Sequence, residues 1–413
     1  SITATDEEES GTSTDYAGNI PVDGNVIGAT TATLESTNGS VSLTGNLTAN
    51  NGLAKIAASD SSDDGVEGVG DITVNGNVKA ATTAEISTDQ GNITVGTAAA
   101  TAPSTTTAAP VTITSGSGLT VEATKSGDIN VTGKLVTADD NTVEGTTTGD
   151  VEVKTAAGDI VLNYGTGDDK DVVNSSKAAL VQTGAGDIDV TGNVIGATTA
   201  TLDGKEGHVN LTGNLTANNG LAKIQAYDEA EAAESNDDGN ITVKGNVVSD
   251  TDGVTITTTN GDITVGTGTD APGAVKAVKA LEISTAGTGD VTVNGNLETT
   301  DSTNGTGNGS AAEGKVSLTK AGNKAGTETA ATEVINSANS VTVTASDKNG
   351  VENLGDIAIA GNVIGATSVD IHTDRGDLQV GTGTETAQIS AVKAGTSLNV
   401  ATNTKGNVTV NGS

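Results

Sequence analysis

A short pattern that recurs along almost the whole chain restricts its fold more than any other feature. The stretch Gly70–Thr97 reads GDITVNGNVKAATTAEISTDQGNITVGT, and its opening returns at Gly91. Three short runs with alternating apolar residues are separated by turns rich in Gly and Asn. About three short strands and three turns per period are typical of one coil of a parallel β-solenoid. We therefore expect an all-β fold, a single-stranded parallel β-helix with surface loop insertions.

The same opening, G-[DN]-[IV]-x-V, recurs from Gly18 to Gly406, and the longer periods carry extra loops. A larger repeat lies above the coil, because GNVIGATTATL at Gly24–Leu34 returns unchanged at Gly192–Leu202. A third copy begins at Gly361. We expect an acidic N-terminal segment over 1–17, followed by one continuous solenoid over 18–413. Its blocks are 18–185, 186–354 and a partial block, 355–413.

Alternation within the short runs predicts which side chains face the interior. The predicted inward residues of one coil are Ile72, Val74, Val78, Ala80, Ala84 and Ile86. Lys55 and Lys223 are expected outside. The Asn residues that follow turn glycines, such as Asn25, Asn46 and Asn77, recur in register and predict a ladder of stacked amides. A short helix is expected only in the Ala- and Glu-rich stretch Gln225–Glu234.

The composition excludes several classes of protein. Phe, Trp, Cys and Met are absent, which does not fit a globular core of large side chains and rules out disulfides and thiolate metal sites. The net charge of −34 repels phosphate, so we expect no nucleic-acid binding. No apolar run is long enough to span a membrane. A start at Ser1 without Met is typical of a mature end after removal of a secretion signal, so we expect a secreted, extracellular or cell-surface protein.

The repeat resembles that of filamentous-haemagglutinin-type bacterial exoproteins and adhesins. GDITVNGNVKA at Gly70–Ala80 is similar to the motif G-[DN]-[IL]-x-[VL]-x-G-N-[LV]-x-A of that family. The resemblance covers most of the chain from Gly18 onward and implies a shaft that is a right-handed parallel β-helix. The amino-terminal secretion domain of the family has no counterpart in this sequence.

The sequence argues against catalysis, although other right-handed β-helices include polysaccharide enzymes. Such enzymes need clustered carboxylates with basic and aromatic side chains, whereas this chain has one Arg and no Trp or Phe. His372, Asp374 and Arg375 form the one mixed triad, for which a solvated strand face is the favoured interpretation. His208 replaces the Asp or Asn of a repeat opening and is expected in a turn. We expect no enzyme and no cofactor, with a polysaccharide-processing enzyme as the minor alternative.

Two short acidic or basic motifs have a binding interpretation beside a structural one. The loops that contain Asp63 and Asp64, and Asp237 and Asp238, offer carboxylates to Ca²⁺, but they match neither an EF-hand nor a nonapeptide calcium repeat. Solvated loops are the favoured interpretation and calcium the alternative. Arg375-Gly376-Asp377 spells a tripeptide that integrins recognise, and chance explains it because the repeat supplies both Gly376 and Asp377.

The two ends of the chain carry the functional hypothesis. The last repeat opening, GNVTVNGS at Gly406–Ser413, lacks the second strand that follows in Gly289–Leu297. The segment Ser1–Thr5 of another copy could supply that strand, because the spacing from Gly412 across the junction to Gly18 equals the spacing from Gly295 to Gly314. The predicted subunit interface consists of Ser1, Ile2, Thr3, Ala4, Thr5, Val408, Val410, Asn411, Gly412 and Ser413.

Such contacts do not close and build filaments. The expected function is therefore a structural subunit of an extracellular filament or surface fibre that polymerises head to tail. Its main partner is then itself. The alternative is a monomeric adhesin shaft whose loops bind cell-surface or host ligands.

Overall fold

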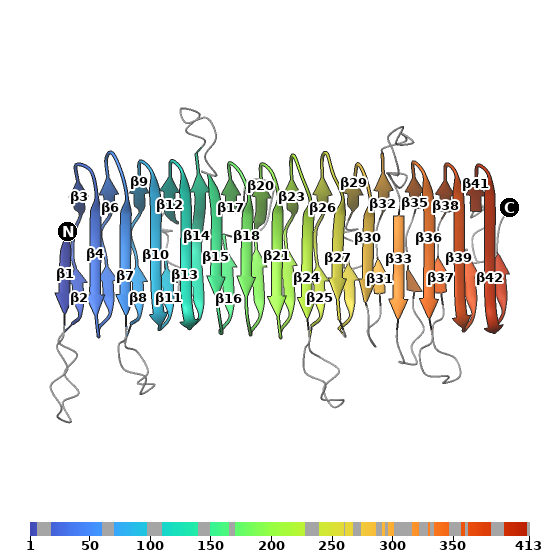
Figure 1. Ribbon diagram of the computed structural model, residues 1–413, viewed down its shortest axis with the longest axis horizontal. Helices are drawn as coiled ribbons and strands as arrows, with labels where there is room; N and C mark the ends of the chain where they lie inside the picture. The colour runs from blue at the N-terminus through green and yellow to red at the C-terminus, as the bar shows by residue number, and fades with distance from the viewer. Residues whose placement is uncertain are drawn as a thin grey trace, which may run out of the picture. The chain divides into compact units, whose positions relative to one another are not determined.

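The computed structural model confirms a parallel β-solenoid built from short strands (Figure 1). The residues that it describes are 1–5, 18–59, 70–96, 110–138, 149–164, 170–227, 239–259, 261–266, 274–285, 291–293, 296–300, 316–321, 329–330, 334–346, 357–359, 362–380 and 392–410. All regular elements among them are strands, and the chain forms two compact units, Ser1–Thr198 and Thr199–Ser413. The predicted block boundaries and the hand of winding stay predictions.

In unit 1 each coil contributes one strand to each of three parallel sheets, here named A, B and C. The first complete coil runs from β2 (Ile20–Val22) in sheet B through β3 (Val26–Gly28) in sheet C to β4 (Ala32–Thr37) in sheet A. The strand β1 (Ile2–Thr5) precedes it and pairs with β4 in sheet A. Each strand pairs in parallel with the equivalent strand of the next coil, as Figure 1 shows.

The further strands of unit 1 follow the same order. Sheet B continues with β5 (Val41–Leu43), β8 (Ile72–Val74), β11 (Ile93–Val95), the first half of β14 (Ile129–Thr137), β16 (Ile160–Asn163) and β19 (Ile188–Thr191). Sheet C continues with β6 (Leu47–Ala49), β9 (Val78–Ala80), β12 (Val111–Ser115), the second half of β14, β17 (Asp171–Ser175) and β20 (Asn193–Gly196). Sheet A continues with β7 (Ala54–Ser59), β10 (Thr83–Gln90), β13 (Gly118–Ser126), β15 (Asp150–Thr155) and β18 (Ala179–Thr183).

Unit 2 has the same three-strand order. Its sheet A strands are β21 (Ala200–Lys205), β24 (Ala222–Tyr227), β27 (Val254–Thr258), β30 (Leu281–Thr285), β33 (Val316–Ala321), β36 (Ser340–Ser346), β39 (Ser368–Arg375) and β42 (Ser397–Lys405). Sheet B contains β22 (Val209–Thr212), β25 (Ile241–Val243), β28 (Ile263–Val265) and β31 (Val291–Val293). In the last coils a four-stranded sheet D takes the place of sheet B, with β34 (Thr329–Ala330), β37 (Ile357–Ile359), β40 (Leu378–Val380) and β43 (Val408–Val410). Sheet C contains β23 (Leu215–Ala217), β26 (Val247–Ser249), β29 (Val275–Ala277), β32 (Leu297–Thr299), β35 (Val334–Ser337), β38 (Asn362–Gly365) and β41 (Val392–Ala394).

The core consists of columns in which one aliphatic side chain lies on the equivalent side chain of the next coil. Leu34, Ile56 and Ile86 form such a column in sheet A, and all three are fully buried. All six predicted inward residues of the coil at 72–86 are buried, and Lys55 and Lys223 lie on the outer face. The alternation therefore predicts the core correctly, because a short strand places successive side chains on opposite faces.

The expected helix at Gln225–Glu234 is wrong for the residues that the structure describes. Gln225, Ala226 and Tyr227 extend strand β24, and 228–234 lie outside the described residues. The cause is the register of sheet A: Ala226 continues the inward alternation of Ala222 and Ile224 and pairs with Thr258 of β27. Pairing with strands in neighbouring coils outweighs the local helix preference of Ala and Glu.

Candidate functional site: the side-chain ladders and the outer strands

In several successive coils, the polar side chain just before the sheet B strand binds the backbone of the next coil. In unit 1, Asp71 Oδ1 accepts the backbone N–H of Asn92 at 2.7 Å, and Asn92 Oδ1 accepts the N–H of Asp128 at 2.8 Å. Asp128 Oδ1 accepts the N–H of Asp159 at 2.9 Å in the same way. We call this series the sheet B ladder. Every bond runs from a side-chain oxygen to the backbone N–H of the following coil, so the ladder has a direction.

A second ladder of the same kind lies before the sheet C strands. Asn25 Oδ1 accepts the N–H of Asn46 at 2.9 Å, Asn46 Oδ1 accepts that of Asn77 at 2.8 Å, and Asn77 Oδ1 accepts that of Thr112 at 2.8 Å. The predicted asparagine ladder is therefore present, but its bonds join side chain to backbone rather than amide to amide. A backbone N–H in a tight corner needs a hydrogen-bond acceptor, and a short polar side chain in the previous coil supplies it.

In unit 2 the sheet B ladder includes a histidine. His208 Nδ1 accepts the N–H of Asn240 at 3.3 Å, and Asn240 Oδ1 accepts that of Asp262 at 2.6 Å. His208 therefore lies at the repeat opening, as its position in the sequence predicts. The bond assigns it the tautomer with an unprotonated Nδ1, because only an unprotonated ring nitrogen can accept.

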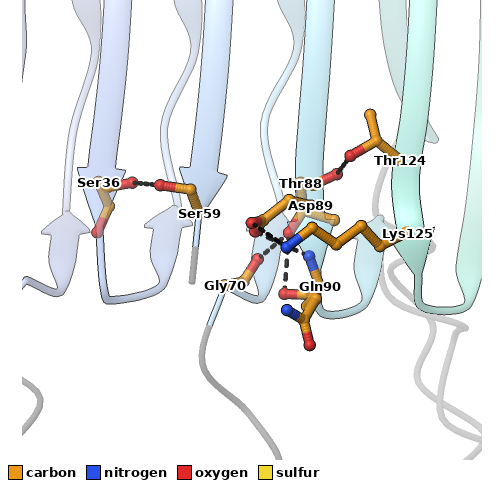
Figure 2. A network of polar contacts seen from close by, with 8 residues as sticks. All are labelled: Ser36, Ser59, Gly70, Thr88, Asp89, Gln90, Thr124 and Lys125. Carbon is orange, nitrogen blue, oxygen red and sulfur yellow. Dashed lines mark hydrogen bonds and ion pairs between the residues drawn. The ribbon is translucent and has the colours of Figure 1, made fainter. Parts of the chain in front are cut away.

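Buried hydroxyls at the ends of sheet A strands donate to the carbonyl of the glycine that opens the same coil, and Figure 2 shows one such corner. Thr88 Oγ1 donates to the carbonyl of Gly70 at 2.8 Å. Equivalent bonds join Thr155 to the carbonyl of Gly127 at 2.8 Å and, in unit 2, Thr258 to that of Gly239 at 2.6 Å. On the outside of the corner in Figure 2, Asp89 forms a long ion pair of 3.6 Å with Lys125.

The corner requires glycine for a steric reason. Gly127 has a φ of 136°, which L side chains rarely adopt, and a Cβ there would overlap the carbonyl of Gly91 in the previous coil. The recurring Gly of the repeat opening is thus explained by the close approach of successive coils.

The predicted interface segment Ser1–Thr5 includes the outermost described strand of sheet A in unit 1. Strand β1 pairs with β4, with Ile2 beside Leu34 and Thr3 beside Glu35. Ile2 is 41% exposed, although it occupies an inward position of the core column. The junction alignment puts Ser1–Thr5 in the second strand of a coil, in sheet C. Within its own chain β1 is instead a third strand, in sheet A.

The predicted interface residues at the other end lie on the outermost described strands of unit 2. Val408 and Val410 are 45% and 44% exposed on β43, whereas their partners on β40, Leu378 and Val380, are buried. Leu398 on the neighbouring β42 is 53% exposed, although it pairs with a buried valine of β39. These apolar side chains occupy core positions but have no covering coil among the described residues.

Other predicted residues stay untested. Asn411, Gly412 and Ser413, and the calcium candidates Asp63, Asp64, Asp237 and Asp238, lie outside the described residues. Within the described part of the chain, no group of three or more His, Cys, Asp or Glu side chains could hold a metal ion.

Of the mixed triad His372, Asp374 and Arg375, the structure shows side-chain contacts for His372, and these contacts are structural. His372 Nδ1 lies 3.2 Å from Asp370 Oδ1, and Asn399 of the next strand donates to the same oxygen at 2.9 Å. Asp377 of the Arg-Gly-Asp tripeptide belongs to the ladder, because its Oδ1 accepts the N–H of Asn407 at 2.8 Å. A carboxylate held in the ladder supports the interpretation of the tripeptide as part of the repeat.

Comparison with known proteins gives no neighbour: no family model, curated protein or solved structure matches the chain significantly. The likeness to filamentous-haemagglutinin-type repeats therefore rests on the motif alone. The described residues contain no helix with the length and apolar character that a membrane span needs.

The ladders and the outer strands are the candidate functional surface. The repeat itself could have indicated the ladders, since Asp or Asn recurs before the sheet B strands. The assignment of β1 to sheet A has no comparable signal in the sequence.

Proposed function

We propose that the protein is a non-enzymatic structural subunit of an extracellular filament or surface fibre. Subunits join head to tail by continuing the β-solenoid from one copy into the next, and the N-terminal strand completes the last coil of a neighbour. The observation that carries the proposal is the set of exposed core-type side chains, Ile2 on β1 and Leu398, Val408 and Val410 on β42 and β43.

These side chains are expected to be covered by a second copy because every coil presents the same pattern to its neighbour. Inside each unit the described strand pairs are parallel, and core residues of adjacent strands lie beside one another, as in the aliphatic pairs Ile72–Ile93, Ile241–Ile263 and Leu378–Val408. An incoming coil of the same sequence type therefore matches an outer coil without rearrangement. Burial of aliphatic area at about 25 cal/mol per Å² favours such contacts, and strand addition provides backbone hydrogen bonds.

The proposal is tested by removing the N-terminal segment. The variant that lacks Ser1–Asp15 should keep its β-sheet circular dichroism spectrum and stay monomeric, while the full chain forms fibres in negative-stain electron microscopy. The matched control removes Asp6–Asp15 only and keeps β1.

Three outcomes would contradict the proposal. Fibres of unchanged subunit spacing from the shorter variant would show that β1 is not needed. A full chain that stays monomeric at high concentration would favour the adhesin shaft with displayed loops. Cleavage of a polysaccharide by the monomer would favour the enzyme.

A further inference from the structure

We propose a specific joint between neighbouring subunits: β42 of one copy pairs with β1 of the next, and β43 pairs with β2. This register places Val400 beside Ile2, and Asn407 beside Asn19, of the neighbouring copy. The inference rests on the proposed function and identifies the strands that carry the contact.

The register in sheet A follows from the repeat and from the pairs within each unit. Ile2 pairs with Leu34, and Val400 pairs with Ile371. Leu34 and Ile371 occupy the same position in two copies of one motif, GNVIGATTATL at Gly24–Leu34 and GNVIGATSVDI at Gly361–Ile371. Ile2 and Val400 therefore belong to the same core column, and Thr3 and Ala401 follow them on the outer face.

The sheet B ladder at Asn19, and the same kind of bond before the sheet D strands at Asn407, supply a complementary donor and acceptor at the joint. Asn19 Oδ1 accepts the N–H of Ser40 at 2.8 Å. Asn92 at the equivalent position donates its N–H to the previous coil, so we infer that the N–H of Asn19 faces the outer side of β2. Asn407 donates through its N–H and its Nδ2 to Asp377, at 2.8 and 3.1 Å, which leaves its Oδ1 for the next coil. Joining β43 to β2 lets Asn407 Oδ1 accept the N–H of Asn19 and so continues the ladder in its own direction.

Pro21 restricts which strands can pair with the outer edge of β2. The N–H of Ile20 donates to Ser40, and the carbonyl of Val22 accepts from Thr44, so both residues point their backbone groups toward β5. Because backbone groups alternate along a strand, the nitrogen of Pro21 points to the opposite, outer edge and has no hydrogen to donate. A proline at this place weakens pairing of β2 with unrelated strand edges. The binding energy of the joint then depends more on the ladder bond and on the β42–β1 pair in sheet A.

Disulfide trapping tests the joint directly, because the chain has no native cysteine. Adjacent parallel strands lie about 4.8 Å apart, which falls within the Cα separation that a disulfide can span. The double variant Thr3→Cys with Ala401→Cys should form a series of covalent oligomers when fibres are oxidised. The matched control is Thr3→Cys with Ala394→Cys, because Ala394 on β41 would neighbour Thr3 only if Ser1–Thr5 were the second strand, in sheet C.

The possible results of disulfide trapping distinguish a failure of the proposed joint from a failure of the proposed filament function. Fibres that cross-link through Ala394→Cys, or not at all, overturn the β42–β1 joint and leave the filament intact. Dimers from either single cysteine variant show like-to-like contacts and overturn it as well. Absence of fibres from the unmutated protein overturns the filament and the joint together.

A second variant tests the pairing of β43 with β2. Pro21→Thr restores the missing donor with a residue that the equivalent positions Thr73 and Thr94 already carry. The critical concentration for polymerisation should fall about fivefold, the effect of one net hydrogen bond. An unchanged critical concentration overturns this part of the joint.

Discussion

At the residue scale, the ladder depends on the acceptor atom more than on the kind of side chain that carries it. Asn92, Asp128 and His208 occupy equivalent positions and each accepts the backbone N–H of the next coil. Their shared property is a short side chain with an acceptor lone pair. Substitutions that keep this lone pair should be tolerated, and those that remove it should leave a corner N–H unsatisfied.

Asp159 allows a matched test of this rule. Its Oδ1 accepts the N–H of Asp187 at 2.8 Å. Asp159→Ala should lower the free energy of unfolding by about 1 kcal/mol, since one hydrogen bond is lost. Asp159→Asn keeps the acceptor and should leave stability unchanged in urea unfolding. Equal losses from both variants would show that charge, not the acceptor, matters here.

Corner glycines give a second residue-scale prediction. Gly127→Ala places a methyl group against the carbonyl of Gly91 at a φ of 136°, so it should destabilise by more than about 1 kcal/mol. Gly118→Ala is the control, because an added Cβ there meets no atom within 4 Å. Its unfolding midpoint should match that of the unmutated protein. A tolerated Gly127→Ala would mean that the corner can relax.

At the element scale, stability comes from columns of aliphatic side chains that continue from strand to strand. Ile56→Ala on β7 should lower the free energy of unfolding by about 2–5 kcal/mol, because the truncation leaves a cavity between Leu34 and Ile86. Ile27→Ala on β3 makes the same chemical change at a side chain that is 69% exposed. Its free energy of unfolding should differ from that of the unmutated protein by no more than about 0.5 kcal/mol. Thermal unfolding of the two variants measures the difference, and similar losses would contradict the column description.

Much of this element-scale description could be predicted from the sequence. The period at Gly70 and Gly91 and the alternation in Ile72–Val74 predict coils, strands and core, because a repeated short strand can bury its apolar side only by stacking. Three features could not be predicted. The strand at Gln225–Tyr227 depends on neighbours in β27. The sequence predicts the ladder, but its bonding from side chain to backbone depends on how closely the corners approach. The place of β1 depends on which sheet Ile2 joins. The junction alignment puts Ile2 at the outward position of Glu298 in sheet C, whereas pairing in sheet A puts it at the inward position beside Leu34.

At the scale of the whole molecule, the coil is the unit that can be added or removed. Deleting Gly70–Gln90, one full period of the repeat, should leave a folded protein with one coil fewer. Val41 would then lie beside Ile93, and Ile56 beside Val121, so each column continues with residues of the same kind. The melting temperature should change by only a few degrees.

A deletion of the wrong length is the control. Removing Gly70–Ala80, only part of a period, takes away two strands of a coil and leaves the third without its connection. This variant should aggregate or lose its β-sheet circular dichroism signal. If both deletions behaved alike, the coil would not be the folding unit.

The aliphatic columns also have a consequence for chemical durability. Among the residues that the structure describes, the buried apolar side chains are those of Val, Ile, Leu and Ala, and the sequence contains no Cys, Met or Trp. Thiols and thioethers are the side-chain groups that mild oxidants convert to polar products, and such products disrupt a packed interior. Because these buried apolar side chains contain no sulfur, peroxide finds no such group to attack in the columns, and their packing should persist under mild oxidation.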